Sequence, residues 1–190
     1  MAAERRVIPW RRRPLDVLIV AFFAVNVGFI TYVVDVEQLV IADPKRFSYP
    51  WWPPPPLVDL VHWWGRHFDP LLMARPAFWR MTIWIDVLCF GPFYVFAIYA
   101  FVRGRAWIKP WALVWCGTMM ANVAIILLEE RSGMYATPRW GIVLGANVPW
   151  FLLPIVVAVR LGRDPHPFTE AVPSTTVPTD SIEVAAVASP

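Results

Sequence analysis

Long apolar runs dominate the pattern of residues along the chain. The first run extends from about residue 15 to residue 34, or on to residue 41, and three more follow at about 81–102, 111–128 and 141–159. A helix needs roughly 20 mostly apolar residues to cross a bilayer. The pattern therefore predicts an all-α integral membrane protein, a bundle of four transmembrane helices.

Glycine and proline interrupt two of these runs, at Gly91-Pro92 in the second and at Pro149 and Pro154 in the fourth. Membrane helices tolerate such breaks where neighbouring helices or polar side chains bond the freed backbone groups. The basic flank before the first run is also compatible with a signal peptide. Because the run is long and no small-residue cleavage site follows it, we interpret it as a retained helix.

Lysine and arginine are concentrated on one side of the predicted bundle. A basic arm at residues 1–14 holds five arginines, the short connection between the second and third runs holds three cations, and the end of the fourth run holds two. Cations on the opposite side are spread over many more residues and are largely matched by acids. The positive-inside rule therefore predicts that both termini are cytoplasmic.

Two segments outside the runs have their own composition. The long outer loop, residues 43–80, contains a stiff proline-rich stretch at 49–56 and then residues 57–64, which suit a short amphipathic helix on the membrane surface. We expect His62 and His67, which lie beside tryptophans, to be interfacial. Residues 163–190 are rich in Pro, Ser and Thr and contain no lysine, and Arg163 is their one arginine, so we expect a disordered cytoplasmic tail outside the fold.

Composition supports a membrane protein and offers little other chemistry. The chain is 58% hydrophobic and 16% charged, with 12 tryptophans, several of them at the ends of apolar runs. No metal-binding spacing, phosphate loop or nucleophile motif is evident, and we expect no cofactor, metal or nucleic-acid partner. Fifteen of the 17 Lys and Arg residues are arginine, which hints at a GC-rich bacterium and its plasma membrane, or the endoplasmic reticulum in a eukaryote.

Charged residues inside spanning helices are the main candidates for function, since each costs roughly 2.5–3.5 kcal/mol on insertion scales. Asp86 lies several residues inside the second run, and Asp35 lies at the outer end of the first, one turn after Thr31. Alternatives remain for both aspartates. Asp35 can be solvated or paired with an outer arginine, and Asp86 can be a hydrogen-bonded link between helices.

The third and fourth runs add polar groups at helical spacing. Trp115, Asn122 and Glu129 are seven residues apart and share a stripe, and Asn147 and Trp150 are one turn apart. We expect most of these groups to converge on a cavity that opens toward the outer leaflet. The alternatives are packing contacts for the asparagines, a plain core position for Trp150, and solvation for Glu129-Glu130 at the outer end.

Two carboxyl groups and a tryptophan in an apolar cavity favour two kinds of chemistry. One carboxyl can stay protonated and act as an acid while the other acts as a base. A tryptophan face attracts cations. Such a site can protonate a carbon–carbon double bond through a carbocation, or it can bind a cationic amphiphile, and the spacing alone does not separate enzyme from binder.

Several short motifs occur in an order known from one family. They are Asp-Pro-Leu-Leu at 69–72, Trp-Ile-Asp at 84–86, the Gly-Pro-Phe-Tyr stretch of 91–104, and Asn-Val-Pro-Trp-Phe-Leu-Leu-Pro at 147–154. Over about residues 15–161 the chain resembles the EXPERA superfamily, which includes a sterol Δ8–Δ7 isomerase and the sigma-2 receptor. The resemblance implies an EXPERA-like four-helix bundle with a lipid-accessible sterol pocket, often as a homodimer.

The resemblance also implies roles for single residues. Asp35 and Asp86 match the proton-shuttling acids of the isomerase, and Trp150 matches its cation-stabilising tryptophan, whereas Thr31 replaces a histidine and both acids are shorter than the glutamates of the isomerase. We therefore expect Asp35, Asp86 and Trp150 to be catalytic. The expected ligand contacts are Thr31, Asp69, Phe90, Phe93, Trp115, Asn122 and Asn147.

The leading hypothesis is a cofactor-independent double-bond isomerase for a steroid or isoprenoid. The alternatives are a non-catalytic sterol, lipid or cationic-amphiphile binder, and an assembly partner with a vestigial pocket.

Overall fold

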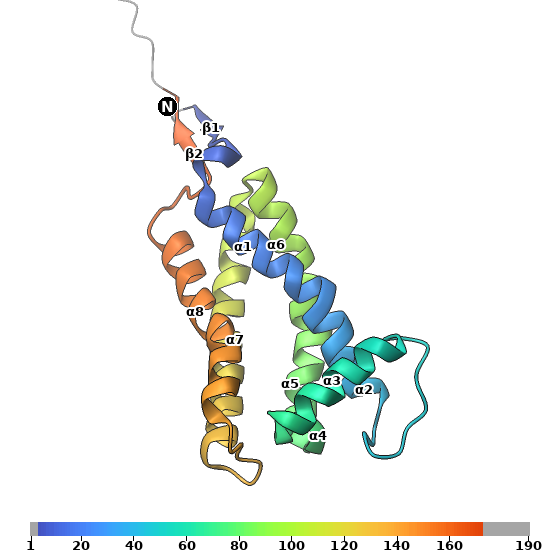
Figure 1. The fold of residues 1–190 in the computed structure, drawn as a ribbon. Helices are drawn as coiled ribbons and strands as arrows, with labels where there is room; N and C mark the ends of the chain where they lie inside the picture. The colour runs from blue at the N-terminus through green and yellow to red at the C-terminus, as the bar shows by residue number, and fades with distance from the viewer. Residues whose placement is uncertain (1–3, 173–190) are drawn as a thin grey trace, which may run out of the picture.

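The computed structural model describes residues 4–172. Within that range four helical stretches are long and apolar enough to cross a membrane, namely Pro14–Val40, Ala77–Arg103, Ala106–Ser132 and Trp140–Gly162. They form one elongated bundle (Figure 1). The prediction of an all-α, four-span membrane protein is confirmed. Most of the observed helices are slightly longer than the apolar runs, because the helical backbone continues into the residues that flank each run.

The first two spans each contain a wider, π-helical stretch. The first runs through α1 (Pro14–Val25), η2 (Asn26–Asp35) and α2 (Val36–Val40), and the second through α5 (Ala77–Ile85), η3 (Asp86–Phe90) and α6 (Gly91–Arg103). Asp35 closes η2 and Asp86 opens η3. Because π-helical turns shift the side chains that follow them and occur often at functional sites, both predicted acids lie where the helix is irregular.

Gly91 lets the first and second spans approach each other at this level. A Cβ atom at position 91 would lie 2.7 Å from Tyr32 Oη and 3.0 Å from Thr31 Cγ2. Pro92 follows in the first turn of α6, where its missing N–H is tolerated. The predicted break at Gly91-Pro92 is thus a point of close helix contact rather than an end of the span.

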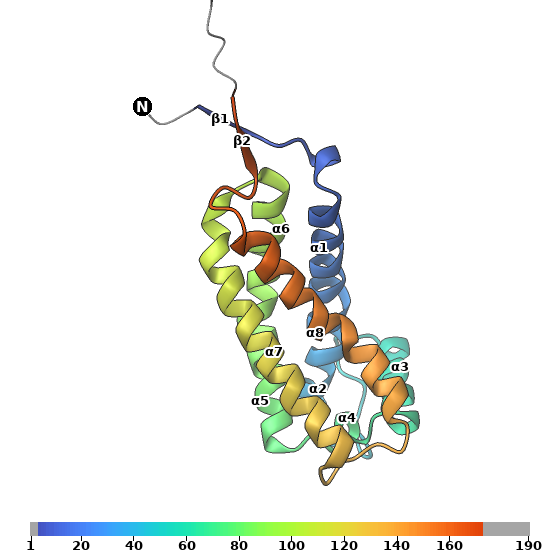
Figure 2. The ribbon, with the colours of Figure 1, turned by 90° about the vertical axis from the view of Figure 1, so that its left-hand side faces the viewer.

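The third and fourth spans form an antiparallel hairpin. The third consists of η4 (Ala106–Ile108) and α7 (Lys109–Ser132), and α8 (Trp140–Gly162) returns beside it (Figure 2). Pro149 and Pro154 lie inside α8 without ending it. An aromatic core holds the bundle together around Phe23, whose ring stacks on Tyr94 at 5.5 Å and meets Trp115 edge-on at 5.2 Å.

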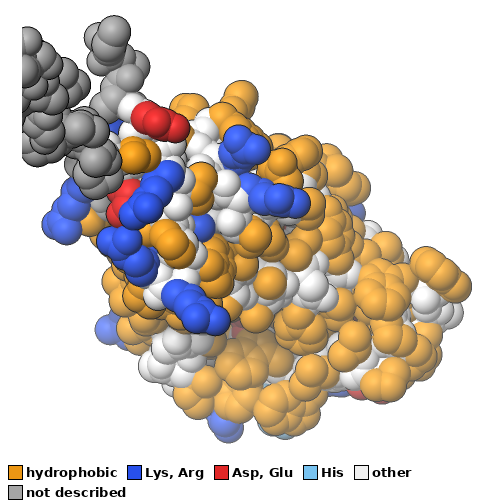
Figure 3. Space-filling model, turned by 90° about the horizontal axis from the view of Figure 1, so that it is seen from above, with side chains coloured by type: hydrophobic (Ala, Val, Ile, Leu, Met, Phe, Trp, Pro, Cys, Tyr) orange, Lys and Arg blue, Asp and Glu red, His pale blue; other side chains and the backbone are white. Residues whose placement is uncertain are grey.

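The two ends of the described chain meet at one end of the bundle. Strand β1 (Arg5–Val7) pairs antiparallel with β2 (Thr169–Ala171), and the short helix η1 (Trp10–Arg12) follows β1. This pairing corrects our prediction of a disordered tail from residue 163, because the tail buries Phe168 and continues the ladder. Residues 173–190 lie outside the described range. Seen from this end, several Lys and Arg side chains gather on the surface of the molecule (Figure 3).

A fully buried aspartate lies just inside this end. Asp16 accepts hydrogen bonds from Arg160 at 2.9 and 3.1 Å and from Arg13 at 3.2 Å. Both guanidinium groups also lie over the ring of Phe168. The first span, the fourth span and the segment after it are therefore joined around one neutralised charge.

At the opposite end, two short helices of the outer loop cover the bundle, and we refer to them as the cap. They are α3 (Pro55–His67) and α4 (Pro70–Ala74), and they lie at the same end of the bundle as α2 and α5 in both views (Figures 1 and 2). The predicted short helix within residues 57–64 is present, but α3 turns Val58, Val61 and Gly65 inward. It is therefore a structural lid on the bundle as well as a surface element.

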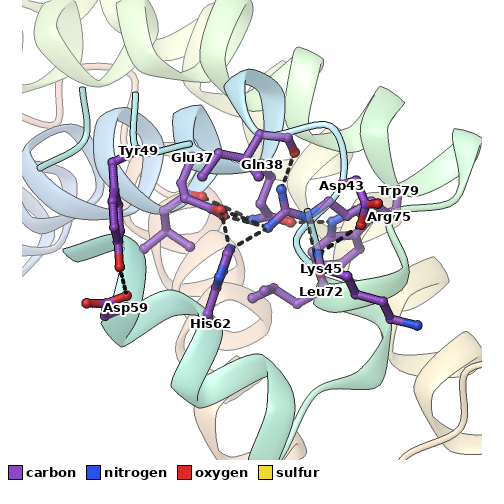
Figure 4. Close-up of polar contacts among 12 residues, drawn as sticks. Glu37, Gln38, Asp43, Lys45, Tyr49, Asp59, His62, Leu72, Arg75 and Trp79 are labelled. Atoms are coloured by element: carbon purple, nitrogen blue, oxygen red, sulfur yellow. Dashed lines mark hydrogen bonds and ion pairs between the residues drawn. The ribbon is translucent and has the colours of Figure 1, made fainter. Parts of the chain in front are cut away.

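A buried ionic cluster fastens the cap to the first span (Figure 4). Arg75 donates to both carboxylate oxygens of Glu37, at 2.9 and 2.8 Å, and to the carbonyls of Ile41 and Leu72. His62 bonds the same carboxylate at 2.8 Å. With 1% of its surface exposed, His62 is not interfacial, which corrects our prediction. The opposite charges of Glu37 and Arg75 neutralise each other in a buried position.

Candidate functional site

A cavity of about 370 Å³ lies between the cap and the outer halves of all four spans. Its walls come from η2, α2, α3, α4, α5, η3, α7 and α8, so no single helix forms it. The predicted site residues on its lining are Asp35, Asp69, Asp86, Phe90, Asn122, Asn147 and Trp150. The predicted convergence of polar groups from the four spans is therefore present in the structure.

Asp86 is held in place from the first span. The hydroxyl Oγ1 of Thr31, a fully buried residue of η2, donates a hydrogen bond to Asp86 Oδ1. The bond links the first and second spans, as the alternative interpretation of Asp86 expected. Among the described residues the other carboxyl oxygen has no hydrogen-bond partner, so it can face a ligand. Thr31 itself does not line the cavity, so it acts on the site through Asp86.

Asp35 has a different environment from Asp86. It is only 6% exposed, and none of its carboxyl contacts in the described chain is a hydrogen bond or an ion pair. Neither solvation nor pairing with an outer arginine, the two alternatives for Asp35, is seen. Asp86 lies close enough to act on it electrostatically. Two carboxyl groups thus line one apolar cavity. Asp86 accepts a hydrogen bond from a hydroxyl group, whereas Asp35 has no hydrogen-bond partner among the described residues.

Trp150 reaches the cavity from α8 and is fixed by a residue that our sequence reasoning missed. Its Nε1 donates to Asn26 Oδ1 at 2.7 Å, and Asn26 Nδ2 donates to the carbonyl of Phe22 at 2.8 Å. The indole also packs against Phe22, with ring centroids 5.7 Å apart. Asn26 is fully buried in an apolar run, and that unusual position is the signal that could have identified it.

Besides Thr31, two more predicted ligand contacts lie away from the cavity lining. Phe93 and Trp115 stack on each other, with centroids 5.5 Å apart and an interplanar angle of 17°, inside the aromatic core. The predicted stripe on the third span therefore divides, because Trp115 faces the core while Asn122 faces the cavity. Asn147 lines the cavity and also donates to the carbonyl of Val143 at 3.0 Å.

The cap supplies the outer wall. Leu60, Val61, Trp63 and Trp64 of α3 and Leu72 of α4 line the cavity, together with Trp79 at the start of α5. Trp79 Nε1 donates to Gln38, so its ring is fixed. The described lining contains three aspartates and four tryptophans but no lysine, arginine or histidine. Its chemistry favours a hydrophobic molecule that carries or acquires positive charge.

Asp69 connects the cavity with the outer end of the third span. Its Oδ1 accepts the amide of Leu72 at 2.9 Å and so caps α4. Beside it lies Glu130, which is fully buried, and neither of its carboxyl oxygens makes a regular hydrogen bond within the described residues. This corrects our expectation that Glu130 is solvated: the loop after α7 folds back over it, with the amide of Thr137 donating to its backbone carbonyl at 2.8 Å.

Comparison with known proteins points to one family. A family model described as EXPERA (EXPanded EBP superfamily) matches residues 56–161. The sigma intracellular receptor 2 of Macaca fascicularis is 23% identical over 173 residues, which cover 84% of this chain and 93% of the receptor. The human sigma intracellular receptor 2 is 23% identical over 172 residues, covering 83% and 93%. The family model thus covers the cap and the second, third and fourth spans.

Proposed function

Because this chain belongs to the EXPERA family, we propose that its cavity takes up a sterol-like or isoprenoid molecule and shifts a carbon–carbon double bond within it. The observation that supports this proposal is the placement of Asp35 and Asp86 in one apolar cavity without a neighbouring cation among the described residues. Two such carboxyls can hold one proton between them, and this proton is what the reaction needs.

The reaction requires one proton in and one proton out. Asp35, which has no hydrogen-bond donor beside it in the described chain, would give its proton to one alkene carbon, and the neighbouring carbon would become a carbocation. Asp86, whose Oδ1 already accepts from Thr31, would take a proton from the next carbon with its free oxygen, and the electron pair of that C–H bond would form the new double bond. Asp86 would then release its proton to the solvent and Asp35 would take one up from it, so both acids are restored and no cofactor is consumed.

Trp150 would stabilise the cation between the two proton transfers. A ring face attracts positive charge more strongly where water is excluded. The hydrogen bond to Asn26 and the contact with Phe22 hold the indole in one orientation, so little reorganisation would be needed when charge develops. Asn122 and Asn147 would orient the ligand through their amides.

A deuterium-labelling experiment tests the isomerase. Purified protein would be incubated with total lipids in heavy water, and lipids that gain one deuterium would be sought by mass spectrometry. We expect a labelled lipid that disappears with Asp86→Asn and persists with Glu129→Gln, an acid of the third span that does not line the cavity. If no lipid gains deuterium while a specific lipid still copurifies, the enzyme proposal is wrong.

The second candidate is a non-catalytic binding protein for a cationic amphiphile. The purely acidic and aromatic lining favours it, as does the likeness to proteins named as receptors. Here Asp35 would pair with the ammonium of the ligand. Titration with a hydrophobic tertiary amine would show tight binding that falls by more than tenfold in Asp35→Asn, without any deuterium incorporation. A vestigial pocket in an assembly partner would instead bind neither amine nor lipid.

The membrane, the orientation and the oligomeric state remain predictions. The basic end carrying β1 and β2 is predicted to be cytoplasmic. Residence in a bacterial plasma membrane or in the endoplasmic reticulum, and assembly into a homodimer, are tested by fractionation and by mass measurement of the detergent-solubilised protein.

A further inference from the structure

The cap is attached to the bundle along two edges that differ in chemistry. On the first-span edge, Arg75 and Glu37 form a complete ion pair. On the third-span edge, Asp69 of the cap lies against Glu130 of α7, and both are buried carboxyl groups, with 5% and 0% exposed. In the part of the chain that the structure describes, no arginine, lysine or histidine forms an ion pair with either of them.

Backbone contacts place these two carboxyls at one seam. Thr137, in the loop after α7, donates its amide to the carbonyl of Glu130 at 2.8 Å and its hydroxyl to the carbonyl of Phe68 at 2.6 Å. Phe68 precedes Asp69 directly. The same threonine thus bridges the cap and the third span next to both acids, so their proximity does not depend on side-chain rotamers alone.

Two adjacent buried carboxylates without a cation repel each other, whereas one shared proton turns repulsion into a hydrogen bond. Burial raises the pKa of Asp69 above its ordinary value, although the hydrogen bond from the Leu72 amide opposes this shift. The closed cap therefore binds a proton that an open, solvated cap would release.

We propose that Asp69 and Glu130 form a proton-dependent clasp that closes the cap over the cavity and releases it as the pair ionises. Because Asp69 lines the cavity, the clasp regulates access to the same site that we propose for the hydrophobic ligand, and in that respect it rests on the proposed function. Opening would move Trp63, Trp64 and Leu72 away from the outer mouth of the cavity.

The direction of the pH effect follows from proton linkage. An acid with a raised pKa in the closed state stabilises that state below the ordinary carboxyl range, and this stabilisation is lost as pH rises toward the raised pKa. Within that window one proton is released on opening, so closure weakens about tenfold per pH unit. The first-span edge, where Arg75 pairs with Glu37, would serve as the hinge.

Other ionisable groups near the seam have partners of their own. Glu129 accepts the amide of Tyr135, Arg139 lies over Phe68 at 5.2 Å, Arg131 lies over Trp140 at 5.8 Å, and His67 bonds the carbonyl of Trp63. At the hinge His62 bonds Glu37, and across the cavity stand Asp35 and Asp86. Any pH effect from these groups would survive removal of the clasp acids.

Hydrogen–deuterium exchange of the full chain in lipid nanodiscs tests the clasp without any ligand. Protection factors of α3 and α4, corrected for intrinsic exchange rates, would be measured from about pH 5.5 to about pH 8, above the ordinary Glu and Asp pKa. We expect wild-type protection to fall as the pH rises, by up to about tenfold per unit where opening releases one proton. In Asp69→Asn with Glu130→Gln it should stay level, because the amides hydrogen-bond without titrating and Asn still caps α4.

Two further variants sharpen the result. Glu129→Gln should retain the wild-type slope, and Glu130→Gln alone should keep the cap more protected than wild type at the upper pH. A level profile in wild type, or a wild-type slope in the double variant, would overturn the clasp. Since no ligand or turnover is involved, failure here leaves the isomerase and binding proposals to their own experiments.

Discussion

Buried carboxyl groups occur in two kinds of surroundings in this bundle. At the end that carries the β1–β2 ladder and at the hinge of the cap, Asp16 and Glu37 each accept hydrogen bonds from guanidinium groups. In and beside the cavity, Asp35, Asp86 and Glu130 have no cation beside them among the described residues. The carboxyl groups with a guanidinium partner join distant segments of the chain. The carboxyl groups without one can be neutralised by a proton or by a positively charged ligand.

The comparison indicates how charge is used in this protein. A buried ion pair depends on both partners, so it strongly favours one arrangement of the chain. A buried carboxyl without a cation contributes little to that arrangement, and its free energy changes with protonation or with a bound cation. Stability and function should therefore respond differently to substitutions at the two kinds of site.

Breaking the hinge pair should have the largest effect. Arg75→Met leaves Glu37 charged and buried, and we expect a loss of about 3–5 kcal/mol of stability. Thermal unfolding in detergent micelles would measure it. Arg80→Met, at an exposed position five residues later, is the matched control. Adding Glu37→Gln should recover part of the loss, and an unchanged melting temperature in Arg75→Met would contradict the comparison.

Filling the space at Gly91 should have the next largest effect. A methyl group there would meet Tyr32 and Thr31 at 2.7 and 3.0 Å, and overpacking of this kind typically costs about 1–3 kcal/mol. Because Thr31 would be displaced from Asp86, turnover or ligand affinity should fall as well. Gly117→Ala, where a Cβ atom meets nothing within 4 Å, should be tolerated in both assays.

The link between Asn26 and Trp150 can be tested by a double-mutant cycle. Trp150→Phe leaves Asn26 Oδ1 buried without a donor, and Asn26→Leu leaves the indole N–H without an acceptor, so each should cost about 1–3 kcal/mol. The double variant should cost less than the sum, because it removes both partners. Strict additivity in the melting data would show that the hydrogen bond does not couple the first and fourth spans.

Neutralising a cavity acid should have the smallest effect on stability. In Asp86→Asn the interhelical bond from Thr31 can be kept, and interhelical hydrogen bonds in membranes average below about 1 kcal/mol in any case. We therefore expect a melting temperature close to wild type together with complete loss of lipid labelling. A stability loss as large as that of Arg75→Met would remove the distinction between the two kinds of carboxyl.

The spans and the cavity acids are predictable from the sequence for physical reasons. An apolar run long enough for the bilayer is rare in soluble domains, so it identifies a span directly, and a charge inside it, as at Asp35 or Asp86, is conspicuous. Asn26 escaped attention because a neutral amide in an apolar run is less conspicuous. A polar amide inside a spanning helix also needs a hydrogen-bond partner, so Asn26 could have been identified by the same reasoning.

The attachment of the cap is not predictable in this way. Glu37 meets His62 and Arg75 across 25 and 38 positions of the chain, and no periodicity connects them. Glu130 stands beside Glu129 at a helix end, a pattern typical of solvated residues, but the returning loop at Thr137 and the cap at Asp69 lie against it and it is buried. Long-range contacts through irregular segments decide which of these polar residues are inside.

The β1–β2 ladder has a consequence for topology that is independent of hydropathy. Arg5 pairs with Ala171 and Val7 with Thr169 in the antiparallel ladder, so the two ends of the described chain must lie on one side of the bilayer. The number of membrane crossings between them is therefore even. Parity is thus fixed by the backbone itself, and a single accessibility label beside either strand would orient all four spans at once.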